Sequence, residues 1–354
     1  MESDRNIDSL HGYFFPETGH FNIVSDPSLP VLGTVGSEGK TKNELRAYYN
    51  DEGIQFIFED TECRKKPYEL TLNIFSRNTG ILETGVMLNK SAIIAGCGSV
   101  GSLVAMELAR SGVGSFMLVD NDILEYHNIC RHQCGVKDVG RYKADALEEK
   151  ILNINPNARI VKQNTILERV KKEDFDSFCT KDTVIIGCGD NRESDLYANN
   201  NVSFVYDIPF VSIGFWERAF AGEIFYSIPG STACYNCQFE NFKEDGDARV
   251  NSNHRFYLDE TNLQDAKFEP GISVDINFVT NIGIKIVLDI LNMNDSSYIP
   301  RVMNHLSQYT LICNTNDVRI GGERAEIFSY PLQVTTSIRI NKRSDCKICS
   351  DFLR

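Results

Sequence analysis

Short apolar runs alternate with amphipathic segments over the middle of the chain, from Lys90 onward. Uninterrupted apolar runs predict strands of a parallel sheet, because such strands are buried on both faces. The runs expected to form these strands are Ala92–Ala95, Phe116–Val119, Arg159–Lys162, Val184–Gly187 and Phe210–Gly214. Helices are predicted at about Ser102–Arg110 and Lys143–Asn153, so the fold class is α/β, a mostly parallel sheet with helices on both faces.

The regular alternation weakens after Gly222. The sequence predicts an antiparallel strand at Gly222–Ile228, a long helix at Asp275–Leu291 and several further strands from Tyr309 onward. These elements predict an antiparallel C-terminal extension.

Residues 1–70 have a different pattern, in which prolines and glycines are frequent. A helical stretch near Asn43–Asn50 and a strand at Ile54–Phe58 predict a small α+β appendage. We expect this appendage to bind a partner or peptide or to contribute a dimer contact, or to be a plain structural extension. Residues 71–354 would form the main domain.

Composition narrows the class of protein. The 354 residues are 42% hydrophobic and carry a formal net charge of -13, which argues against a surface for nucleic acid or anionic membranes. The N-terminus lacks the features of a signal peptide, and no run of about 18 apolar residues is present, so we expect a cytoplasmic protein without a membrane span. The 11 cysteines are isolated or stand in CxxC pairs, which favours buried thiols and metal ligands over disulfides.

A glycine-rich turn follows the first predicted parallel strand. Gly96, Gly98 and Gly101 form GxGxxG between a strand and a helix, where backbone N–H groups can approach a phosphate. Asp120 ends the next strand and can accept hydrogen bonds from ribose hydroxyls. This combination predicts a Rossmann-like nucleotide site, for either ATP or a nicotinamide or flavin dinucleotide.

Several polar residues after Asp120 favour a triphosphate. Arg131 can bridge phosphate oxygens and Lys143, at the start of a helix, can neutralise a departing pyrophosphate. Asp190 follows a parallel strand and could hold Mg²⁺. Taken singly, each could instead be a solvated charge, a turn residue such as Asp122, or a helix N-cap.

Two CxxC pairs supply four thiols, the number that a closed structural zinc site requires. They are Cys234 with Cys237 and Cys346 with Cys349. The sequence therefore predicts a structural Zn²⁺ site that ties the C-terminal tail to the sheet domain, with a redox pair as the alternative.

The order of these motifs resembles the ThiF/MoeB superfamily, which includes ubiquitin-activating enzymes, sulfur-carrier adenylyltransferases and microcin-type peptide adenylases. The resemblance runs from about Phe75 to the C-terminus, and its motifs are GCGSVG, LVDND, NICRH, GRYK, GCGDN, CYNC and CKIC.

This resemblance implies an ATP-dependent adenylyltransferase that converts a carboxylate to an acyl-adenylate. It implies that ATP is held by Gly96, Gly98, Gly101, Asp120, Asp122, Asn128, Arg131 and Lys143, and Mg²⁺ by Asp190. Arg77, in the pair Arg77-Asn78, would act in the ATP site of a neighbouring subunit, which implies a homodimer. His132 is either a neighbour of the phosphate site or a packed histidine.

The resemblance implies a substrate that is the C-terminus of a ubiquitin-like or sulfur-carrier protein, or a ribosomally made peptide. The stretch Gln238–Asp275 has no cysteine, so a thioester step at the place usual for the family is not expected, as in microcin-type adenylases. A nicotinamide-dependent oxidoreductase and a non-catalytic nucleotide-binding scaffold are the alternatives from other functional classes.

Overall fold

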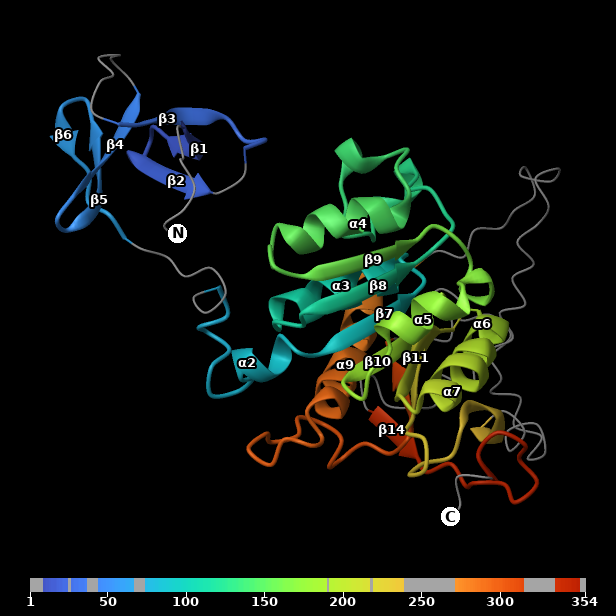
Figure 1. Cartoon of the computed structure of the whole chain (residues 1–354). Helices are drawn as coiled ribbons and strands as arrows, with labels where there is room; N and C mark the ends of the chain where they lie inside the picture. Colours follow the sequence, from blue (N-terminus) through green and yellow to red (C-terminus); the bar gives the residue numbers. More distant parts are fainter. Residues whose placement is uncertain are drawn as a thin grey trace. The chain divides into compact units, whose positions relative to one another are not determined.

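The computed structural model describes residues 9–24, 27–36, 44–66, 74–189, 191–216, 219–238, 271–314 and 335–350. The chain divides into two compact units, Met1–Glu69 and Leu70–Arg354. The order of elements in each unit is drawn in Figure 1.

The described residues of the first unit form one curled, six-stranded sheet. Its strands are β1 (Ser9–Phe15), β2 (His20–Val24), β3 (Val31–Val35), β4 (Leu45–Asn50), β5 (Gly53–Phe58) and β6 (Thr61–Glu62). They lie in the order β2-β1-β3-β4-β5-β6, and only β3 and β4 are parallel. The Phe58 ring lies 5.4 Å from that of Phe14 and 4.9 Å from that of Phe21, which brings β5 over β1 and β2 around a small apolar core.

The helix predicted near Asn43–Asn50 is wrong, because Leu45–Asn50 is strand β4. Leu45 and Ala47 are buried and alternate with more exposed neighbours, a period of two that fits a sheet with one covered face. Pairing with β3 and β5 on either side fixes this conformation. The described part of this unit is therefore all-β and not α+β.

The second unit is built on an eight-stranded sheet in the order β14-β13-β12-β11-β10-β7-β8-β9. Its parallel strands are β7 (Ser91–Ala95), β8 (Ser115–Val119), β9 (Arg159–Gln163), β10 (Thr183–Gly187) and β11 (Phe210–Phe215). Strand order therefore reverses between β7 and β10, the point at which ligands bind in doubly wound sheets.

Both faces of the parallel strands β7, β10 and β11 are covered, as their apolar sequences predict, whereas the edge strand β9 has no buried residue. Ile94 and Ile186 pack with α3 (Ser99–Arg110), α4 (Lys143–Leu152) and α9 (Ser273–Leu291). Ile93 and Ile185 point to the opposite face, which is covered by α5 (Lys172–Phe178), the π-helix η4 (Ala198–Ser203) and α7 (Phe204–Tyr206). In Figure 1, α5 and α7 lie in front of the sheet and α9 behind it.

The predicted antiparallel extension is confirmed. It consists of β12 (Ala221–Ser227), β13 (Tyr309–Cys313) and β14 (Thr335–Ile338). The shorter helices of this unit are α2 (Thr84–Met87), η1 (Tyr126–Asn128), η2 (Val136–Asp138), η3 (Leu167–Arg169) and α6 (Arg192–Tyr197). Within the described ranges, no helix is both long and apolar enough to cross a bilayer.

Candidate functional site

The glycine turn lies at the carboxyl end of β7, where the sheet order reverses. Gly96 has a φ of 96°, and a Cβ there would lie 2.8 Å from the backbone of Gly189 after β10. A Cβ on Gly101 would overlap the carbonyl oxygen of Gly96, so α3 packs directly on the turn. In the part of the chain that the structure describes, no atom lies within 4 Å of a Cβ on Gly98, the N-cap of α3. The two outer glycines thus shape the turn, and the described residues leave space beside the middle one.

Asp120 holds this turn from the end of β8. Its Oδ2 accepts a hydrogen bond from the Cys97 N–H (2.6 Å) and its Oδ1 from the Asp122 N–H (2.7 Å). Burial raises the pKa of Asp120, and the charge of Lys143 and these two N–H donors act against that rise. Each carboxylate oxygen can accept more than one hydrogen bond, so Asp120 can still receive a hydroxyl.

Lys143 brings a buried cation to the same place. Its side chain is only 11% exposed, and its Nζ lies 2.7 Å from Asp122 Oδ2. The Lys143 N–H also donates to the Asp122 carbonyl (3.0 Å), so the start of α4 is tied to the segment that follows β8. A lysine this buried needs a nearby anion, and Asp122 supplies one.

Asn128 and Arg131 lie on the loop between β8 and α4. Asn128 Oδ1 accepts from the Glu125 N–H (2.9 Å) and stabilises the turn η1. Arg131 is half-buried, with an Nη1 atom 3.6 Å from where a Cβ on Gly271 would stand.

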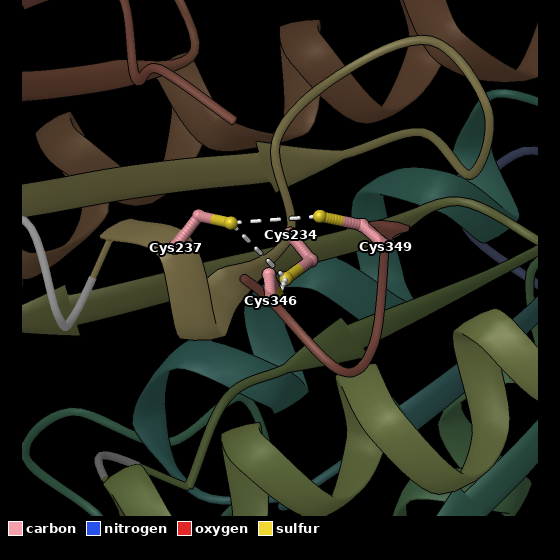
Figure 2. A group of neighbouring side chains, drawn as sticks. All are labelled: Cys234, Cys237, Cys346 and Cys349. Carbon is pink, nitrogen blue, oxygen red and sulfur yellow. Dashed lines mark hydrogen bonds between the residues drawn. The ribbon is translucent and has the colours of Figure 1, made fainter. Parts of the chain in front are cut away.

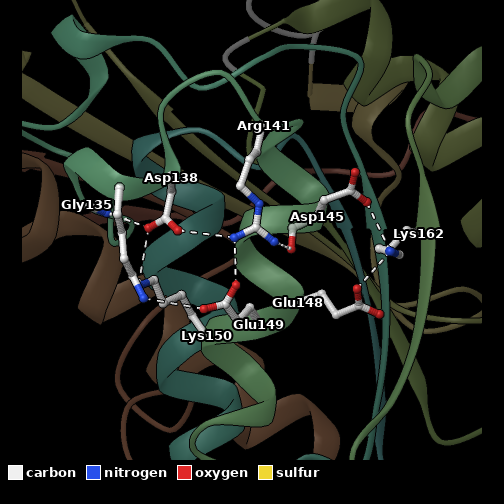
Figure 3. Close-up of polar contacts among 9 residues, drawn as sticks. Gly135, Asp138, Arg141, Asp145, Glu148, Glu149, Lys150 and Lys162 are labelled. Atoms are coloured by element: carbon white, nitrogen blue, oxygen red, sulfur yellow. Dashed lines mark hydrogen bonds and ion pairs between the residues drawn. The ribbon is translucent and has the colours of Figure 1, made fainter. Parts of the chain in front are cut away.

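A charged network fastens this loop to α4 (Figure 3). The carboxylate of Asp138, 1% exposed, accepts from the Gly135 N–H (2.9 Å) and pairs with Lys150 (3.3 Å) and Arg141 (3.3 Å). Arg141 also pairs with Glu149 (2.6 Å). Hydrogen bonding holds the pKa of Asp138 below its usual range against the opposing effect of burial. The network therefore fixes the loop against the helix that carries Lys143.

Asp190, the predicted magnesium ligand, lies outside the described residues. Gly189 before it touches the glycine turn, and Asn191 after it caps α6 by accepting from the Glu193 and Ser194 N–H groups. The N-cap role, which the sequence offered as an alternative for Asp190, is therefore filled by Asn191.

Arg77 is not brought to this site within one chain. Its neighbour Asn78 donates from Nδ2 to the Arg110 carbonyl (2.8 Å), at the far end of α3 from the glycine turn. Because α3 has 12 residues and a helix rises about 1.5 Å per residue, about 18 Å of helix separates the two ends. Arg77 itself is exposed.

The four cysteines predicted to bind metal meet on the face of the sheet that α5, η4 and α7 cover (Figure 2). All are buried, and their Sγ atoms lie within 4.8 Å of one another. The separations are 3.7 Å for Cys234–Cys237, 3.4 Å for Cys234–Cys346 and 3.5 Å for Cys237–Cys349. Four sulfurs about 2.3 Å from a tetrahedral ion are about 3.8 Å apart, so the cluster has the dimensions of such a site.

The thiols of the cluster share protons through hydrogen bonds. Hydrogen bonding from Cys234 lowers the pKa of Cys237, which also accepts from the Arg343 N–H, and hydrogen bonding to Cys237 together with burial raises the pKa of Cys234. Burial raises the pKa of Cys349. Thiolates are the metal-binding form, so a bound ion would have to displace the remaining protons.

The CYNC turn also contacts the helices that follow Asn191. The Tyr235 N–H donates to Asn199 Oδ1 (3.1 Å), and Asn200 donates to Asn236 Oδ1 (3.4 Å). Asn199 is fully buried in the π-helix η4. The cysteine cluster is thus connected to η4, which follows β10 by way of α6, and not only to the C-terminal tail.

Some residues of these sites were not expected from the sequence. They include Asp138, which orders the loop, and the pair Ser212 and Asp195, in which the Ser212 hydroxyl donates to the buried carboxylate. Cys188, close in sequence to Asp190, is buried and its thiol pKa is raised by burial, as a packing residue requires. A polar residue in an otherwise apolar segment, such as Ser212 within β11, was the one available signal.

The fold and the glycine turn define a Rossmann-type α/β protein. Residues 73–321 match the model of the ThiF family, and the chain belongs to this family.

The curated relatives share only part of their length with this chain. Ubiquitin-like modifier-activating enzyme 5 of Caenorhabditis elegans is 28% identical over 181 residues, 47% of this chain and 42% of the relative. The enzyme of that name from Arabidopsis thaliana is 27% identical over 251 residues, 62% and 56% of the two chains. The chain therefore spans about half the length of the curated relatives it matches.

Solved structures show the same fold. Escherichia coli MccB with ATP superimposes with a TM-score of 0.56 at 20% identity, over 80% of this chain and 76% of that one. PaaA superimposes with a TM-score of 0.51 at 17% identity, over 71% and 82%.

Proposed function

We propose that this protein is an ATP-dependent adenylyltransferase that activates the C-terminal carboxylate of a small protein or peptide. The observation that carries the proposal is the buried Lys143 ammonium group, ion-paired with Asp122 beside the open glycine turn. A buried cation here favours a triphosphate over NAD, which the glycines and Asp120 alone would fit equally well. The names of the relatives, and a similar fold solved with ATP, support the same activity.

The proposed reaction is an in-line attack of a carboxylate oxygen on the α-phosphorus of ATP. The new bond joins that oxygen to phosphorus, the bond to the bridging oxygen breaks, and pyrophosphate leaves with the electron pair. A carboxylate is already ionised near neutral pH, so no general base is needed. Arg131 and Lys143 would offset the charge that develops on the phosphates, and Asp120 would hold the ribose.

We propose two metals with separate roles. Mg²⁺, held by Asp190, would supply charge neutralisation between phosphate oxygens. Zn²⁺, held by the four-cysteine cluster, would be structural, because four thiolates leave no open coordination position.

The sequence also bears on which group accepts the acyl group from the adenylate. Because Gln238–Asp275 contains no cysteine, we propose that no thiol of this segment attacks the adenylate and that another nucleophile reacts with it directly. This favours a peptide-modifying adenylase over a thioester-forming one, and a related fold solved with N-formylated MccA is consistent with it. The all-β first unit would then bind the peptide or partner.

The test is ATP-pyrophosphate exchange by the purified protein with a candidate carboxylate partner. The variants Arg131→Ala, Lys143→Ala and Asp190→Ala are expected to lower the exchange rate by about 10² to 10³, since each removes a charge that acts on the phosphates. The matched control is Lys137→Ala, a lysine of the same loop whose side chain is 70% exposed. Exchange that is equally reduced in the control, or unchanged in all three variants, would remove these roles.

The role of Arg77 can be tested by mixing two inactive variants. We propose that Arg77 of one subunit completes the site of a second copy, because about 18 Å of helix separates it from its own chain's turn. Mixing Arg77→Ala with Asp190→Ala is expected to restore about a quarter of the wild-type exchange activity, as random pairing of subunits would give one intact site in a mixed dimer. Activity of the mixture no higher than that of either variant alone would mean that the site is not shared.

A further inference from the structure

His132 is a buried histidine in direct contact with the glycine turn. His132 directly follows Arg131 in the sequence, and only 7% of its surface is exposed. Its Nε2 is 2.8 Å from the Cys97 carbonyl, and its Nδ1 is 3.0 Å from the Cys134 N–H. A backbone N–H can only donate, so Nδ1 must be the acceptor, and Nε2 must carry the proton and donate to Cys97.

This contact belongs to a series that fixes the loop after Arg131. Three successive N–H groups each donate to a side chain: Gln133 to Ser102 Oγ (3.3 Å), Cys134 to His132 Nδ1 (3.0 Å) and Gly135 to Asp138 Oδ2 (2.9 Å). Two of the three acceptors also contact the backbone of the glycine turn: Ser102, from within α3, donates to the Gly98 carbonyl (2.9 Å), and His132 donates from the loop itself to the Cys97 carbonyl (2.8 Å). His132 therefore connects the loop of Arg131 to the turn that contains Gly98.

We propose that His132, in its neutral Nε2-protonated form, is a positioning residue that holds the glycine turn and the Arg131 loop in their nucleotide-binding arrangement. This inference rests on the proposed function, because it assumes that the turn binds ATP. His132 touches neither substrate nor reacting atoms in this role. It acts by pairing the Cys97 carbonyl and the Cys134 N–H, two backbone groups of buried residues that are costly to leave without a hydrogen bond.

The arrangement requires a neutral ring. An imidazolium carries a proton on Nδ1 that would point at the Cys134 N–H, so this hydrogen bond would be lost. Burial lowers the pKa of His132, and the charged groups facing it are Lys143 of α4, which lowers it further, and Asp138 of η2, which raises it. The pKa of His132 in the folded protein lies below the unfolded value of 6.5. Its contribution to the stability of this arrangement is therefore complete above pH 6.5 and is lost as the pH falls below that value.

Two substitutions separate positioning from simple packing. His132→Gln keeps an N–H donor that can reach the Cys97 carbonyl and does not titrate. His132→Phe keeps a ring of similar size and removes both hydrogen bonds. His127→Gln is the matched control, because His127 is on the same loop with its side chain 55% exposed.

The experiment measures the dissociation constant for Mg-ATP between pH 7.5 and 5.0, at a temperature where all variants are folded. At pH 7.5, His132→Phe is expected to bind about tenfold more weakly, and His132→Gln within about threefold of wild type. The γ-phosphate of ATP titrates in the same range, so the pH effect is taken as the ratio of variant to wild type at each pH.

Relative to wild type, His132→Gln is expected to gain affinity about threefold or more as the pH falls, while His127→Gln keeps a constant ratio. Wild-type affinity in folded His132→Phe, or a constant ratio for His132→Gln, would overturn the inference. Failure of the wild type to bind Mg-ATP at any pH would instead overturn the proposed function.

Discussion

The variant Cys346→Ala is expected to lose its bound metal and at least about 3 kcal/mol of unfolding free energy, a fraction of what a structural zinc supplies to small domains. For a unit of this size, Leu70–Arg354, that corresponds to a fall of about 5 °C in the unfolding midpoint. Cys346 lies 3.4 Å from Cys234 across 112 residues of chain, so its thiolate joins two distant segments. The measurements are metal content per chain by elemental analysis and thermal unfolding.

The matched control is Cys313→Ala, because Cys313 is also buried and packs against the same core without belonging to the cluster. It is expected to keep about one metal per chain and to lose only the packing of a small side chain, about 1 kcal/mol. Equal destabilisation by the two substitutions, or metal retained in Cys346→Ala, would mean that the cluster does not bind a structural ion.

Metal loss should also reach the proposed ATP site. The CYNC turn is bonded to Asn199 and Asn200, which follow the end of β10 by way of α6. Exchange activity of Cys346→Ala is therefore expected to fall severalfold even well below its unfolding midpoint, as the segment after Gly189 loses this support.

The sequence was most informative where one physical requirement dominated. The central parallel strands of the second unit are buried on both faces, so β7 and β10 are nearly continuous apolar runs that can be recognised locally. The cysteine cluster was equally accessible, because each CxxC pair has a spacing that only a turn around a shared ligand explains well. Two predictions are therefore confirmed: β7 and β10 are parallel strands, and the four thiols lie together.

Strand β4 was missed because its local preference is weak. Leu45 to Asn50 contains alanine, leucine and arginine, which favour helices, and two tyrosines, which favour strands. Hydrogen bonding to β3 and β5 decides between them, and β3 approaches so closely that a Cβ on Gly33 would overlap the Leu45 backbone. Such pairing depends on residues outside the segment itself.

Around the proposed ATP site, the sequence indicated the residues at strand and helix ends but not those that orient them. Asp120 and Lys143 stand at the end of β8 and the start of α4, positions that follow from the element pattern. His132 and Asp138 act through backbone groups of an irregular loop. The conformation of such a loop cannot be predicted from hydrophobic periodicity, because the loop has none. Their roles follow from the contacts that the folded loop makes.

The variant Gly101→Ala is expected to lose both stability and ATP binding. An added Cβ would overlap the Gly96 carbonyl oxygen, which is backbone and cannot move aside as a flexible side chain could. Helix α3 would have to move away from the turn, at a cost of about 3 kcal/mol or more, and the turn would be displaced with it. Urea unfolding and a Mg-ATP binding titration measure the two effects.

Gly98→Ala is the matched comparison, and it should separate these effects. Among the described residues, nothing lies within 4 Å of a Cβ on Gly98, whose φ of -74° suits any residue, so the unfolding free energy should change by no more than about 1 kcal/mol. Affinity for Mg-ATP should nevertheless fall at least about tenfold, because the methyl group would occupy the space proposed for phosphate. A stable Gly98→Ala protein with wild-type affinity would show that the open side of the turn is not where the nucleotide binds, whatever Gly101→Ala does to the fold.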